Sequence, residues 1–75
     1  MEKVLQLTAV IERAGDGYVA TCPEVDVVSQ GNTVEEAMSN LKEAVELFLA
    51  CASPEEIEGR LHSEVYITAF EVASG

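Results

Sequence analysis

The feature that most constrains the fold is a complete start signal for a long α-helix. Thr33 stands three residues before Glu36. A threonine in this position accepts a hydrogen bond from an unpaired amide of the first turn, and the glutamate can bond back to the amide of the cap. The charges of Glu35 and Glu36 also suit the positive end of the helix dipole. We therefore expect a helix over residues 34–52.

Apolar residues recur at intervals of three and four along this helix, so they form one continuous stripe. The stripe consists of Val34, Ala37, Met38, Leu41, Ala44, Val45, Phe48 and Ala52. We expect it to pack on a sheet and to supply most of the core. Leu47 lies off the stripe, so it is either simply exposed or in contact with a partner.

Three stretches with β-strand character precede the helix, at residues 3–13, 18–22 and 27–30. Alternation in the first stretch predicts one face made by Leu5, Leu7, Ala9 and Ile11. The turn between the first two stretches contains Asp16-Gly17, a pair that favours tight hairpins. The first two strands are therefore expected to be antiparallel.

A second helix start and a last strand follow the long helix. Ser53 is a capping residue, Pro54 suits the first helical position, and Gly59 should end a helix of one or two turns. Residues 64–72 have the pattern of a strand with apolar residues on both faces. Such a strand needs cover on both faces, so we expect a homodimer or a higher oligomer.

The elements predict a single α+β domain spanning residues 1–75. Their order is three strands, a long helix, a short helix and a last strand (β-β-β-α-β), with three antiparallel strands and a fourth. One long helix can cover only one face of such a sheet. A chain this short has a small core, so self-association would add stability.

The charge of the chain is strongly acidic. Fourteen acidic and four basic residues give a formal net charge of −10. Direct binding of nucleic acid needs clustered lysines and arginines, so it is not expected of the monomer. An acidic surface suits a basic protein partner, although acidity can also serve solubility alone.

The two cysteines, Cys22 and Cys51, do not make a disulfide framework. We expect both to be reduced and buried, which indicates the cytoplasm. No apolar run has the length of a membrane span or the form of a signal peptide. With one histidine and two cysteines, no metal ion or other cofactor is expected.

No catalytic group stands out. His62, the one histidine, lies in a polar loop, and nothing in the sequence places a cysteine beside it. The pair Glu24 and Asp26 could hold a divalent metal in a divergent nuclease, but a solvated loop is the simpler explanation. We therefore expect a binding protein rather than an enzyme. The candidate contacts with a partner are Tyr18, Glu24, Asp26, Leu47 and Tyr66.

Several short motifs, taken in order, resemble the HicB-like antitoxin domain. They are Gly17-Tyr18-Val19-Ala20, Cys22-Pro23-Glu24, the run from Gln30 to Ala37 that contains Gly31-Asn32-Thr33-Val34-Glu35-Glu36, and Asn40-Leu41-Lys42-Glu43-Ala44. The resemblance covers roughly residues 5–49.

The resemblance implies a partial ribonuclease-H-like fold and an antitoxin that blocks the RNA site of a small basic HicA-type ribonuclease toxin. The middle of the first strand has no acidic residue, which argues against nuclease activity. Many members also carry a C-terminal DNA-binding segment, and none is recognised here, so autorepression by DNA binding is expected only if the toxin complex supplies it. The alternative is an orphan oligomeric HicB-like domain with another protein- or ligand-binding regulatory role.

Overall fold

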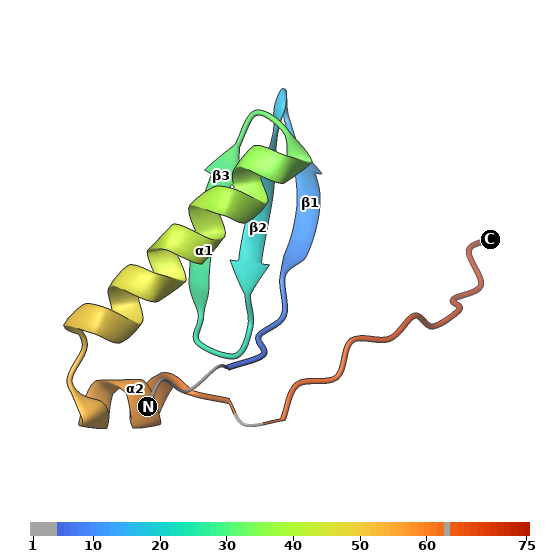
Figure 1. The fold of residues 1–75 in the computed structure, drawn as a ribbon. Coiled ribbons are helices and arrows are strands. Elements are labelled where there is room, and N and C mark those ends of the chain that lie inside the picture. Colours follow the sequence, from blue (N-terminus) through green and yellow to red (C-terminus); the bar gives the residue numbers. More distant parts are fainter. Residues whose placement is uncertain (1–4, 63) are drawn as a thin grey trace.

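The computed structural model describes residues 5–62 and 64–75 and shows an α+β fold of two layers. Its elements are β1 (Val10–Ala14), β2 (Gly17–Cys22), β3 (Val27–Gly31), α1 (Val34–Cys51) and α2 (Pro54–Arg60). The three strands form one antiparallel sheet in the order β1-β2-β3. Helix α1 lies across one face of this sheet (Figure 1). The expected three-stranded antiparallel sheet and two helices are thereby confirmed.

The core lies between the sheet and α1. Six residues are buried there: Ala20, Cys22, Val25, Ala37, Leu41 and Val45. Leu7, Ala9 and Ile11 pack against this cluster, as the alternation of the first stretch predicted. The expected stripe of α1 is only partly covered, because Val34 and Met38 stay exposed.

Both helices begin as the sequence predicts. Thr33 Oγ1 accepts a hydrogen bond from the Glu36 amide at 3.0 Å. The Glu36 carboxylate accepts one from the amide of Asn32, one residue before the expected donor, also at 3.0 Å. Ser53 caps α2 by accepting from the Glu56 amide at 3.2 Å. Each cap satisfies an amide that the first helical turn leaves without a partner.

The first strand is shorter than expected. Residues 3 and 4 lie outside the described residues, and residues 5–9 belong to no strand. The register pairs Val10 with Thr21, so the residues before Val10 face the end of β2 and Pro23, which has no amide to donate. The amide of Thr8 donates to the carboxylate of Glu24 and not to a main-chain oxygen. The missing main-chain donor at Pro23 and the side-chain bond of Thr8 agree with a ladder that begins only at Val10.

The expected last strand is also not formed. Residues 64–75 are not part of the sheet; they extend away from the rest of the chain (Figure 1). Tyr66 and Phe70 are each 83% exposed. Alternating apolar residues indicate a sequence able to form a strand, but a strand exists only where a neighbour supplies hydrogen bonds. The observed order of described elements is therefore β-β-β-α-α.

Candidate protein-binding surfaces

The five candidate contact residues fall into three separate regions. Glu24 and Asp26 lie in the turn between β2 and β3, and Glu24 lines a shallow hollow together with Tyr66. Tyr18 lies at the other end of β2, beside the hairpin to β1. Leu47 lies on α1. The candidates therefore do not form one continuous site.

The carboxylate of Glu24 is engaged inside the protein. The Thr8 amide lies 3.0 Å from each of its oxygens, and the Thr8 hydroxyl donates to Oε2 at 2.6 Å. Burial acts to raise the pKa of Glu24, but the hydrogen bonds from Thr8 outweigh it and lower the pKa below its ordinary value. Glu24 thus joins the segment before β1 to the turn after β2.

Asp26 connects the same turn to the chain that follows α2. Its φ angle is +55°, a left-handed conformation that aspartate tolerates better than most residues. Its main-chain oxygen accepts a hydrogen bond from Arg60 at 2.7 Å, and its carboxylate lies 3.0 Å from His62 Nε2. The amide of His62 also donates to the main-chain oxygen of Glu24 at 2.7 Å. These contacts fix the point from which residues 64–75 depart.

Tyr18 contributes to the core rather than to an open surface. It is half-buried and packs against the central cluster. The guanidinium of Arg13 lies 5.7 Å from the centre of its ring, within the range of a cation–π contact. Only part of this tyrosine is free to touch another molecule.

Leu47 lies on an open acidic surface. It is 65% exposed, as its place off the apolar stripe predicted. Glu43 and Glu46 of the same helix border it, and Ser29 of β3 and Asn40 complete a shallow hollow around it. An exposed leucine among carboxylates is suited to a partner with an apolar pocket and basic residues around it.

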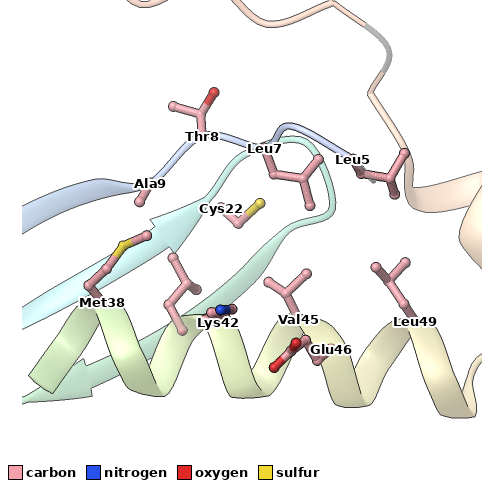
Figure 2. A pocket seen from close by; sticks show the side chains of 11 residues that line it. Leu5, Leu7, Thr8, Ala9, Cys22, Met38, Lys42, Val45, Glu46 and Leu49 are labelled. Atoms are coloured by element: carbon pink, nitrogen blue, oxygen red, sulfur yellow. The ribbon is translucent and has the colours of Figure 1, made fainter. Parts of the chain in front are cut away.

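An apolar groove beside α1 was not found from the sequence. It has a volume of about 420 Å³ and lies between residues 5–9 and α1. Figure 2 shows Leu5 and Leu7 pointing toward Val45 and Leu49 across this space. The groove exists because α1 packs mainly on β3 and β2 and only slightly on β1. No pattern in the sequence specifies that α1 lies over β3 and β2 and leaves β1 largely uncovered.

The candidate chemical groups of the chain are its cysteines, its histidine and its acidic side chains. Within residues 5–62 and 64–75, no group of three His, Cys, Asp or Glu side chains could hold a metal ion. The ring of His62 bonds to Asp26, not to a cysteine. Cys22 is buried as expected, whereas Cys51 is exposed, because it ends α1 beyond the part that packs on the sheet.

Two relatives place the chain in a family. A UPF0150 protein of Helicobacter pylori (strain J99) is 38% identical over 68 residues, which cover 89% of this chain and 94% of the relative. The chain belongs to the UPF0150 family. A UPF0150 protein of Synechocystis sp. is 48% identical over 46 residues, 59% of this chain and 64% of that protein. Neither name of these UPF0150 relatives states an activity, a substrate or a partner.

Two other comparisons of this UPF0150 protein with known proteins reveal no further similarity. No family model and no solved structure matches it. Among its described helices, none is long and apolar enough to cross a membrane.

Proposed function

We propose that this UPF0150 protein is an antitoxin-like binding protein of the cytoplasm. Its partner is a small basic ribonuclease of the HicA type, which it neutralises by covering the RNA site. The observation that carries this proposal is the acidity of the chain, with a formal net charge of −10. A basic, RNA-binding surface attracts such a protein over long distances and is complementary to it at contact.

The few positive charges do little to interrupt this acidity. The guanidinium of Arg13 lies over Tyr18, and that of Arg60 lies 4.6 Å from the centre of the Phe48 ring. Both arginines are thus held against aromatic rings of their own chain. On α1, Glu35, Glu36, Glu43 and Glu46 are all exposed. The outer side of this helix is therefore the best acidic surface for the partner.

Within that surface, Leu47 is the proposed anchor. It supplies apolar area at the centre, while Glu43 and Glu46 supply charge around it. Interfaces commonly combine an apolar centre with a polar rim in this way. Asp26 and Glu24 are weaker candidates, because their carboxylates already contact His62 and Thr8.

The relation to the ribonuclease-H-like fold belongs to the same proposal. That fold requires a fourth strand in addition to the three antiparallel strands and the helix. Residues 64–72 are the candidate for it, and β1 has no strand on its outer side in the described structure. The proposed function does not need a catalytic centre, because occlusion of the partner's RNA site is sufficient.

The test measures RNA cleavage by the purified basic partner in the presence of equimolar UPF0150 protein. The surface variants are Leu47→Ala and Glu43→Lys, and Glu58→Lys, at an exposed position of α2, is the matched control with the same change of charge. We expect the surface variants to weaken inhibition at least about tenfold, and the control to change it less than about threefold. Equal loss in Glu43→Lys and Glu58→Lys would refute a contact surface at Leu47.

A second candidate function is binding of a small apolar ligand by an orphan oligomeric protein. The groove between residues 5–9 and α1 favours this alternative, because its size and its leucines suit such a ligand. Native purification without any basic companion, together with a bound apolar molecule identified by mass, would favour it over the antitoxin role.

A further inference from the structure

We propose that residues 64–72 are the fourth strand of a second copy of this chain. In this arrangement, the segment pairs with the free outer edge of β1 in its partner and covers the apolar groove. The partner's segment does the same in return. This inference concerns self-association alone and stands whether or not the chain is an antitoxin.

The segment has the composition of a strand but lacks a neighbour. It alternates Val65, Ile67 and Ala69 with Tyr66, Phe70 and Val72. Ile67, Phe70 and Val72 are exposed, as is Tyr66. An extended, apolar, unpaired segment of this kind is a template for pairing with another chain.

The receiving edge offers both hydrogen bonds and apolar contacts. Strand β1 pairs only with β2 within the described residues, so the main-chain groups on its outer side are free. Beside this edge, the groove lined by Leu5, Leu7 and Leu49 is left open by α1 (Figure 2). Residues 5–14 and 64–72 both span about 30 Å when extended. A strand laid along residues 5–14 would therefore match their length and cover the leucines.

The other edge of the sheet is a poorer receptor. The hollow beside β3 contains Glu43 and Glu46 and no basic residue. The segment itself carries Glu64 and Glu71, so charge repulsion opposes pairing there. The groove beside β1 includes Lys42 as well as Glu46, and thus has less excess negative charge.

The course of the segment favours exchange between copies over folding back within one chain. Only its beginning, Glu64, Val65 and Tyr66, lines a hollow with Leu5 and Leu7; the rest diverges from β1 (Figure 1). The radius of gyration is 14.5 Å, against about 11 Å for a compact chain of this length. Among residues 5–62 and 64–75, only six are buried in the core. Reciprocal exchange would cover two grooves at once and enlarge this small core.

The first test is sedimentation equilibrium of the full chain at micromolar concentration. We expect a dimer for the unmodified protein and a monomer for Thr68→Pro, because proline removes a strand amide and does not fit a paired strand. Ser74→Pro, outside the paired residues, is the matched control and should remain dimeric. Circular dichroism should show the same helix content in all three, because residue 68 is exposed in the monomer. A monomeric unmodified protein, or a dimeric Thr68→Pro, would overturn the proposal.

The second test separates exchange from folding back. Two variants, Glu12→Cys and Thr68→Cys, are made in a Cys51→Ser background, mixed after unfolding, refolded together and treated with a short bismaleimide. We expect a covalent heterodimer of the two variants. The control is a double variant that carries both Glu12→Cys and Thr68→Cys in one chain. If this double variant is linked only within one chain and the mixture gives no heterodimer, the segment pairs with its own β1 and exchange is overturned.

Discussion

Thr8 and Glu24, sixteen residues apart, are joined by a hydrogen bond of 2.6 Å between the hydroxyl of the first and the carboxylate of the second. The Thr8 amide lies 3.0 Å from both carboxylate oxygens. Glu24 thereby accepts from a residue that precedes β1 and belongs to no strand. This contact holds residues 5–9 in the position where they form one wall of the apolar groove.

Glu24→Gln should lower the stability of the fold. The neutral amide accepts hydrogen bonds less strongly than a carboxylate, and its NH₂ group cannot accept from Thr8 at all. We expect a loss of about 1–3 kcal/mol in the free energy of unfolding, measured by urea denaturation at pH 7. Glu58→Gln, an exposed substitution on α2, is the control and should change stability by less than about 0.5 kcal/mol. Equal stability of Glu24→Gln and the unmodified protein would contradict the role of this contact.

The same contact predicts a pH dependence. The pKa of Glu24 is lowered in the folded protein, because the hydrogen bonds from Thr8 outweigh the effect of burial. In acid the unfolded chain therefore binds more protons at this residue than the folded chain does. The stabilisation is present above the ordinary glutamate pKa and is lost as pH falls through the lowered value. The unmodified protein should have the larger free energy of unfolding, and its advantage over Glu24→Gln should shrink as the pH falls through this range. An advantage that grows in acid would contradict the predicted pH dependence.

Gly31 and Gly59 should respond in opposite ways to alanine. A Cβ atom on Gly31 would lie 2.5 Å from the main-chain nitrogen of Ala37, whereas one on Gly59 would meet nothing within 4 Å. We expect Gly31→Ala to cost about 1–3 kcal/mol. Gly59→Ala should stabilise α2 by about 0.5–1 kcal/mol. Thermal unfolding followed by circular dichroism measures both, and a neutral Gly31→Ala would disprove the close approach of β3 and α1.

The two cysteines should differ in reactivity. Burial raises the pKa of the Cys22 thiol, so little thiolate is present and access is poor, while Cys51 is exposed. In the folded protein, iodoacetamide should modify Cys51 at least about tenfold faster than Cys22. Peptide mass spectrometry after timed quenching measures the two rates, and denaturant should bring them together. Comparable rates in the folded state would show that Cys22 is not protected.

Salt should affect the two proposed associations in opposite directions. Two copies with a charge of −10 each repel one another, so added salt should strengthen the exchanged dimer by screening. The complex with a basic ribonuclease should weaken over the same range, because there the charges attract. Binding measured at roughly 0.05 M and 0.5 M salt separates the two effects. A dimer that weakens with salt would indicate that contacts between opposite charges hold it together.

Local signals in the sequence predicted the local structure well. The caps at Thr33 and Ser53, the glycine-containing hairpin and the alternation of Leu7, Ala9 and Ile11 all act between near neighbours or along one element. Their hydrogen bonds and side-chain faces are specified within a few residues, so a sequence pattern is sufficient to find them. Exposure of Leu47 followed from the same helical periodicity.

What the sequence did not predict depends on contacts between distant elements. The apolar groove arises from the sideways position of α1 on the sheet, and the engagement of Glu24 depends on Thr8 coming close to it. The last segment has the alternation of a strand, but alternation does not say whether a partner edge is present in the same chain. The candidate contacts were chosen by charge and residue type, which explains why Tyr18 and Glu24 prove to be largely engaged internally.

The most direct test of the proposed function is purification of the tagged full chain from its native cells at low salt, with identification of its companion by mass. We expect a small basic protein that cleaves RNA once it is separated and is inhibited again when the chain is returned. Recovery of homo-oligomers alone, including under stress that induces toxins, would contradict the antitoxin role.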